Sequence, residues 1–181
     1  MIVSLKPFLL LSLLAAALAC PCLAASYSPI IGNSAQSEDA DARAGEFRKV
    51  VRVVDGDTIV VSPHEKVRLI GVDTPETVHP KKAVACFGKQ ATQFTRDAVE
   101  GKTIRLVLDK VNTKRRHKDR YGRTLAYVYL ENGTMLNREL IRQGYGHAYT
   151  RFPFRYLVEF RQIERAARTE TVGLWLSCPL G

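Results

Sequence analysis

The sequence predicts an α+β fold in which five β-strands close into a small barrel accompanied by three α-helices. Strand-type runs come first along the chain, a helical pattern is inserted after the third run, and further helical patterns come last. An open five-stranded sheet would expose its edges, whereas a closed barrel has none. The 181 residues are 46% hydrophobic and 25% charged, which is ordinary globular composition, so we expect one folded domain.

The strands are predicted from β-branched runs and from the alternation of apolar with polar side chains. They cover residues 49–54, 58–61, 66–72, 102–108 and 123–130. Asp55-Gly56-Asp57 stands between the first two strands, and an Asp-Gly pair in that place indicates a hairpin. After the last strand, Asn132-Gly133 turns the chain.

Three segments carry apolar residues at helical spacing. The first covers residues 88–100, the second covers residues 136–144 and ends at a glycine, and the third is opened by Pro153. Their apolar faces are expected to pack on the barrel, and Trp175 is expected to cover the end of the core.

The N-terminus has the layout of a secretory signal peptide. Lys6 precedes an apolar run at 7–20, and the small residues Ala24 and Ala25 follow. The run is shorter than the roughly 20 apolar residues of a spanning helix, so we expect cleavage and no stable membrane span. Export to the periplasm or the medium follows. Cys20 lies in an imperfect lipoprotein box, so lipidation there is kept only as the alternative.

The chain therefore divides into four segments. These are a signal peptide at 1–25, a polar flexible leader at 26–45, the folded domain at 46–176 and a tail at 177–181. Cleavage leaves Cys86 and Cys178 as the two cysteines of the mature chain. An oxidising compartment permits a disulfide between them, and two free thiols are the alternative.

The charge favours an anionic partner. Lys and Arg number 27 against 18 Asp and Glu, a formal net charge of +9. Such a field attracts polyphosphates and makes binding salt-dependent. Charge alone does not separate nucleic acid from an anionic membrane.

Acidic residues gather in two turns. Asp55-Gly56-Asp57-Thr58 follows the first strand, Asp73-Thr74-Pro75-Glu76-Thr77 follows the third, and Arg68 lies within that third strand. Carboxylate and carbonyl oxygens suit calcium or magnesium rather than soft metals, and no Cys and His cluster at zinc spacing competes. Taken alone, Asp-Gly is usually only a turn, so Asp55 is assigned to the turn, and the pattern leaves function open.

The order of the motifs is more specific. The strings VVRVVDGDTIVV, VRLIGVDTPET, HPKK, DRYGRTLAYVYL, LNRELIRQGYGHAY and GLW resemble the staphylococcal nuclease (thermonuclease) family. The resemblance covers residues 49–175 and implies an OB-fold barrel with three helices, in agreement with the strand count. It also implies a calcium-dependent endonuclease that acts on DNA or RNA and leaves 3′-phosphate ends. We expect such a protein to be a monomer.

The resemblance implies roles at individual positions. Asp57 and Asp73 match the carboxylates that bind calcium, and the main-chain oxygen of Thr74 is a further ligand. Glu76 matches the acid that contacts the attacking water. The remaining matches are the phosphate-clamping Arg68 and Arg123, the phosphate donor Tyr121, the base-stacking Tyr149, and the basic positions Lys81, Lys82 and Arg120.

A noncatalytic OB-fold module that only binds nucleic acid is the rival interpretation, because this fold also hosts passive binders. Retention of the acids and arginines argues against it, and equally against an envelope protein that merely faces anionic lipid. Two departures from the family pattern remain. Residues 111–118 are longer and more basic than the usual connection, and Thr150-Arg151-Phe152-Pro153 lacks a second stacking tyrosine.

Overall fold

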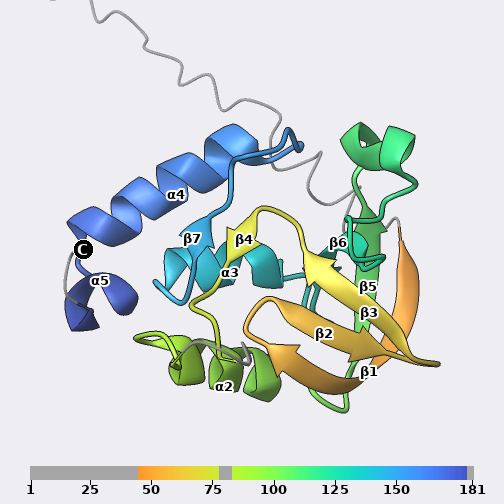
Figure 1. Cartoon of the computed structure of the whole chain (residues 1–181), viewed down its shortest axis with the longest axis horizontal. Helices are drawn as coiled ribbons and strands as arrows, with labels where there is room; N and C mark the ends of the chain where they lie inside the picture. The colour runs from red at the N-terminus through yellow and green to blue at the C-terminus, as the bar shows by residue number, and fades with distance from the viewer. Residues whose placement is uncertain (1–44, 78–82, 179–181) are drawn as a thin grey trace, which may run out of the picture. The chain divides into compact units, whose positions relative to one another are not determined.

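A computed structural model describes residues 45–77 and 83–178, with the side chain of Arg115 excepted. The barrel strands are β1 (Glu46–Asp55), β2 (Thr58–Val61), β3 (Glu65–Leu69), β5 (Thr103–Leu108) and β6 (Thr124–Tyr129). They close in the order β1-β2-β3-β6-β5, so the predicted five-stranded barrel is confirmed (Figure 1). The predicted signal peptide, the leader up to residue 44, and Lys81 and Lys82 lie outside the described residues.

The barrel closes because β1 pairs with two different strands, β5 and β2. Its first half pairs with β5, from Glu46 opposite Leu106 to Lys49 opposite Thr103. Its second half pairs with β2, with register shifts on either side of the pairs Arg52–Val60 and Val53–Ile59. Such irregularities bend a strand and increase its twist. The last seam is the parallel pairing of β3 with β6.

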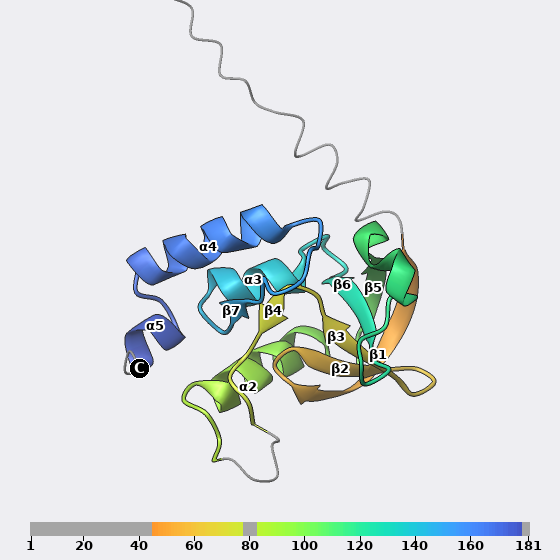
Figure 2. The same cartoon turned by 45° about the horizontal axis from the view of Figure 1, so that its top comes forward.

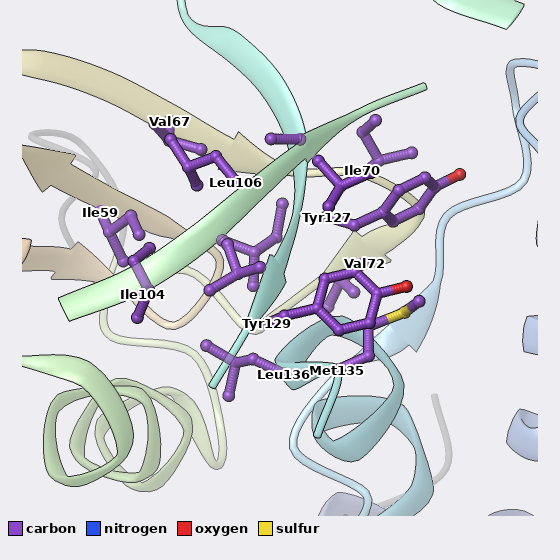
Figure 3. Close-up of a cluster of buried hydrophobic side chains, with 14 of the residues drawn as sticks. Ile59, Val67, Ile70, Val72, Ile104, Leu106, Tyr127, Tyr129, Met135 and Leu136 are labelled. Atoms are coloured by element: carbon purple, nitrogen blue, oxygen red, sulfur yellow. The ribbon is translucent and has the colours of Figure 1, made fainter. Parts of the chain in front are cut away.

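Alternate side chains of these strands fill the barrel. Ile59, Val67 and Ile104 are at most 1% exposed, and Figure 3 shows them pointing into one shared interior. Tyr127 and Tyr129 are 1% and 2% exposed, so both side chains belong to this core. This rigid interior carries the turns in which the acidic residues lie.

The helices follow the predicted segments, but the first two end one and two residues earlier than predicted and the third starts later. They are α2 (Gly88–Val99), α3 (Leu136–Arg142), α4 (Leu157–Thr169), the short α5 (Leu174–Ser177) and a 3-10 helix, η1 (Lys110–Arg115). The third helix begins at Leu157 and not at Pro153, because the backbone of Tyr156 (φ −95°, ψ 20°) lies outside the helical region. The backbone nitrogen of Arg155, just before it, donates to buried Asp109 at 2.9 Å. None of the described helices combines the length and apolarity that crossing a bilayer requires.

A small second sheet was not predicted. β4 (Val72–Asp73) pairs antiparallel with β7 (His147–Ala148), so that Asp73 lies opposite His147. Figures 1 and 2 both show this pair between the barrel and α4. The segment after α3 is therefore placed directly beside the acidic turn that follows β3.

A disulfide joins Cys86 to Cys178, as the sequence permitted. It closes a loop of sequence separation 92 and ties the segment before α2 to the end of α5. Cross-links of native geometry commonly stabilise a fold by roughly 2–4 kcal/mol. This one also fixes the C-terminal segment near the acidic turns.

Candidate active site

The two acidic turns are joined through the carboxylate of Asp57. Its Oδ2 accepts hydrogen bonds from the nitrogen of Thr74 at 2.9 Å and from Thr74 Oγ1 at 3.1 Å. Its Oδ1 accepts from Thr58 Oγ1 at 2.9 Å. Asp57 is 6% exposed, so these contacts fix the orientation of a nearly buried carboxylate.

Arg68 extends from β3 into the space between the acids. Its Nη2 lies 3.1 Å from Asp57 Oδ2 and 2.9 Å from Asp73 Oδ1. Its Nη1 donates to the carbonyl oxygen of Val72 at 2.6 Å. Two carboxylate oxygens from different turns therefore converge on one positively charged nitrogen.

This convergence fits a hard cation. Asp57 and Asp73 supply only oxygen, which calcium prefers, and their oxygens already lie at contact distance from a single cationic group. Within 45–77 and 83–178, no three His, Cys, Asp or Glu side chains gather as a metal site. A calcium ion takes roughly six to eight oxygens, so a carbonyl such as that of Thr74 and water would complete its shell.

Burial and neighbouring charges act on the pKa of Asp73, the more exposed of the two carboxylates. Burial by the surrounding protein raises the pKa of Asp73, the charge of Arg68 opposes this, and the negative charge of Asp57 adds to it. The carboxyl is thus held in a balance of charges that a bound cation would shift toward ionisation.

Asp55 anchors the first turn, in agreement with its assignment as a turn residue. Its Oδ1 accepts from Thr77 Oγ1 at 2.8 Å, from Thr92 Oγ1 at 3.1 Å and from the nitrogen of Gly56 at 2.8 Å. Burial raises the pKa of Asp55, and its contact with Glu76 raises it further. Asp55 therefore connects the turn with α2 and with the segment that carries Glu76.

Gly56 permits the two turns to approach. A Cβ atom built on it would lie 2.7 Å from Thr74 Oγ1, closer than real Cβ contacts. The carbonyl oxygen of Gly56 also accepts from Thr95 Oγ1 of α2 at 2.6 Å. The glycine in the Asp-Gly-Asp motif thus serves the close contact of two loops as well as the hairpin.

Arg123 enters from the other side, held by Asp119. Its Nε donates to Asp119 Oδ2 at 2.7 Å, and its Nη1 lies 3.4 Å from Thr58 Oγ1. Asp119 Oδ1 also accepts from the nitrogens of Tyr121 and Arg123, at 2.8 and 2.9 Å. Asp119 was not among the predicted site residues, although an aspartate that opens a tight turn before a glycine is a recognisable signal.

Asp119 holds its charge well into the acidic range. Burial alone would raise its pKa, but hydrogen bonds from Arg123 and Tyr121, with the charge of Arg123, hold the pKa of Asp119 below its usual 3.8. A depressed folded-state pKa contributes stability above the unfolded value, and this contribution is lost as the pH falls through the lower folded-state value. The ionised form of Asp119, which is the form that pairs with Arg123, is therefore favoured in the folded protein.

We expect Asp119→Asn to lower kcat up to about a hundredfold with a much smaller change in KM. Arg123 would lose its charged partner, and its guanidinium group would no longer be held in one orientation. The variant should also lose part of the stability gradient that the parent shows below about pH 4. Steady-state kinetics and acid-unfolding curves measure the two effects. Asp97→Asn, which removes a charge from an exposed position bonded to Gln93, is the control. Equal kcat in both variants would contradict the orienting role.

Two cavities meet at these residues. Cavity A has a volume of about 920 Å³ and is lined by Asp57, Glu76 and other residues of the acidic turns. Cavity B has a volume of about 800 Å³ and is lined by Tyr121 and Tyr149 among others. Their walls share Arg68, Asp73 and Arg123.

Cavity B holds the predicted substrate-binding side chains. Tyr121 is 67% exposed, and its hydroxyl accepts from Arg120 Nη2 at 2.6 Å. Tyr149 donates its backbone nitrogen to the carbonyl oxygen of Gly71 at 2.9 Å, which fixes it beside the barrel. Its ring centroid lies 6.1 Å from that of Phe152, which is 47% exposed. The second stacking tyrosine of the family pattern is missing from residues 150–153, and Phe152 of this segment lines the cavity.

The structure thus brings together all predicted site residues that it describes. These are Asp57, Arg68, Asp73, Thr74, Glu76, Arg120, Tyr121, Arg123 and Tyr149. The roles of Lys81 and Lys82 stay a prediction. Within the basic segment, Lys118 Nζ lies 3.0 Å from Glu65 Oε1, so this lysine is engaged in the protein itself.

Comparisons with known proteins agree with this geometry. The family model described as "Staphylococcal nuclease homologue" matches residues 66–177. The thermonuclease of Staphylococcus hyicus is 41% identical over 131 residues, which are 70% of this chain and 74% of the relative. That of Staphylococcus intermedius is 42% identical over 137 residues, 72% and 77% of the two chains. Endonuclease YncB of Bacillus subtilis is 35% identical over 129 residues, 68% and 59%. The chain belongs to the staphylococcal nuclease family.

Proposed function

We propose that this protein is an exported, calcium-dependent endonuclease that hydrolyses phosphodiester bonds of DNA or RNA as a monomer and leaves 3′-phosphate ends. Its family, with thermonuclease and endonuclease relatives, makes it a nuclease and a hydrolase. Calcium, export, the monomeric state and the product ends are the parts that we add. One observation supports metal-dependent hydrolysis most: Asp57, Asp73, Glu76 and the two arginines Arg68 and Arg123 face cavity A together.

The arginines bind the reacting phosphate. Arg68 and Arg123 both line the junction of the cavities, and a planar guanidinium group suits the oxygens of a phosphate. Charge that develops on these oxygens in the transition state is stabilised by donors already in place. Asp119 supplies this preorganisation for Arg123.

Glu76 acts on the attacking water. It lies at the wall of cavity A beside Asp73 and Thr74, and a carboxylate in this position can orient water and accept its proton. The oxygen of this water forms a bond to phosphorus while the bond from phosphorus to the 5′ oxygen breaks, and the 5′ oxygen takes up a proton. When bound by Asp57 and Asp73, calcium neutralises phosphate charge and lowers the pKa of a coordinated water.

Calcium should be required for cleavage. Mature protein with plasmid DNA, and separately with RNA, is expected to cut at least one of them with added calcium, to stop when a chelator is present, and to resume when calcium is restored, because Asp57 and Asp73 need a cation to meet an anionic phosphate. Gel analysis of the products and of their end groups measures the reaction. Cleavage that persists in chelator would contradict the metal assignment. Calcium-independent binding without any cleavage would support the rival OB-fold binding module.

Export is the second part of the proposal. The apolar run at 7–20, followed by Ala24 and Ala25, supports removal of residues 1–25 by signal peptidase. The Cys86–Cys178 disulfide fits an oxidising compartment. Intact-mass measurement of the exported protein is expected to give a chain that begins near Ser26. A diacylglyceryl adduct on Cys20, or a retained N-terminus, would contradict it.

A further inference from the structure

Cavity A reaches beyond the groups that the proposed mechanism uses. Its far wall is formed by His147 of β7, Arg168 of α4, Leu174 and Trp175 of α5, and the Cys86–Cys178 disulfide. Figures 1 and 2 show α4 and α5 on the same side of the molecule as β4 and β7. No step of the proposed hydrolysis uses these side chains, so this wall is available for another role.

The far wall begins at His147, directly beside one of the acidic residues. His147 is the register partner of Asp73 in the β4–β7 sheet. Its ring meets Trp175 edge-on, with 4.9 Å between ring centroids. The guanidinium carbon of Arg168 lies 4.2 Å from the centroid of Trp175. Asp73, His147, Trp175 and Arg168 therefore form one continuous surface that leads out of the catalytic centre.

This surface is open and carries the guanidinium group of Arg168. The side chain of Arg168 is 54% exposed and that of His147 is 44% exposed. Trp175, which was expected to cover the end of the core, is only partly buried and lines the cavity instead. Glu164 contacts both basic groups, at 3.3 Å from Arg168 and 3.5 Å from His147, and so holds them in place.

Such a surface suits a nucleotide. A guanidinium plane supported by an indole can stack against a base, and its free donors can meet a phosphate. A cavity of about 920 Å³ lies in the range that encloses small ligands. Every phosphodiester carries a nucleoside on each side, and two cavities meet at Arg68 and Arg123.

We propose that cavity A holds the nucleotide on one side of the scissile phosphate, with Arg168 and Trp175 as its platform, while cavity B holds the nucleotide on the other side. The inference rests on the proposed function, because it places the scissile phosphate at Arg68 and Arg123. It assigns a binding role to α4 and α5, which otherwise only pack on the fold.

Trp175 supplies a direct readout, because it is the single tryptophan of the chain. Thymidine 3′-monophosphate and thymidine 5′-monophosphate are the probes. With the phosphate at the arginines, one of them directs its nucleoside into cavity A and the other into cavity B. Only the former should change the emission of Trp175 on titration in calcium, after correction for absorption by the nucleotide.

Substitutions then identify the platform. Arg168→Gln should weaken the emission-active mononucleotide about fivefold or more, which corresponds to at least the loss of one stacking contact, and should spare the other. Tyr149→Leu in cavity B should do the reverse. Arg165→Gln removes the same charge from the same helix at an exposed position outside both cavities and should change neither affinity. On an oligonucleotide substrate, Arg168→Gln should raise KM with kcat preserved.

Two failures are distinguishable. If the parent cleaves nucleic acid but Arg168→Gln matches Arg165→Gln in both mononucleotide affinities and in KM, the subsite is wrong and the proposed nuclease function stands. Equal weakening of both mononucleotides by Arg168→Gln would also overturn the subsite, because it would show a general charge effect. If the parent cleaves no nucleic acid, the proposed function fails and the subsite fails with it.

Discussion

Replacing Glu76 by glutamine is expected to lower kcat by about 10²- to 10⁴-fold, the usual contribution of a positioned acid–base group. The amide keeps the size and the hydrogen-bonding shape of the side chain but cannot take a proton from water. The side chain of Glu76 contacts Asp55 within the acidic turns, and the amide of glutamine can also donate a hydrogen bond to that carboxylate. Affinity for nucleic acid should stay near that of the parent, since Arg68 and Arg123 still bind phosphate.

Single-turnover kinetics in calcium, together with the Kd of an oligonucleotide, separates the two effects. Glu131→Gln removes the same charge from an exposed residue at the turn after β6 and should keep the parental kcat. If Glu76→Gln turns over at the rate of Glu131→Gln, Glu76 is not the group that acts on water. A parallel loss of affinity and rate would instead indicate that Glu76 shapes the phosphate site.

Replacing Arg123 by lysine should lower kcat by about 10²- to 10³-fold even though the charge is kept. Arg123 uses Nε for Asp119 and directs Nη1 toward Thr58, so its fork is oriented before substrate arrives. A lysine has a single nitrogen, which cannot contact Asp119 and two phosphate oxygens in fixed directions. The loss should appear in kcat more than in KM, because the missing contact matters most in the transition state.

Arg165→Lys, at an exposed position of α4, is the matched control and should keep the kcat and KM of the parent. Combining Arg123→Lys with Asp119→Asn adds a second test. If Asp119 acts through Arg123, the double variant should lose little more than Arg123→Lys alone. Additive losses would show that Asp119 works through another route. A fully active Arg123→Lys would contradict the proposed phosphate clamp.

Much of the site could be predicted because its residues belong to short local patterns. The Asp-Gly pair between β-branched runs placed Asp57 at the tip of a hairpin, and the motif after the third strand placed Asp73 and Glu76 in a turn. Alternation of apolar side chains predicted the barrel strands for a similar reason, since each strand buries one face. Local spacing reports such features directly.

The remaining parts depend on contacts between distant segments. The backbone of Tyr156 is not helical, so α4 starts only at Leu157, and no periodicity in residues 153–157 reports this. Asp119 is recognisable as a turn residue, but its hold on Arg123 appears only in three dimensions. Phe152 likewise joins Tyr149 in cavity B without any signal in its own neighbourhood.

The sequence by itself determined the barrel strands, the helical segments and the turns that hold the acidic residues, because periodicity and turn chemistry act over a few residues. The roles expected of the acids and arginines came from the resemblance to the family. Tertiary structure alone decided which distant groups meet. It paired His147 with Asp73, joined Cys86 to Cys178, and stacked Arg168 on Trp175 at the far wall of cavity A. These contacts arise when α4 and α5 pack beside the small sheet, and packing between distant segments is a property of the whole fold that local sequence patterns do not contain.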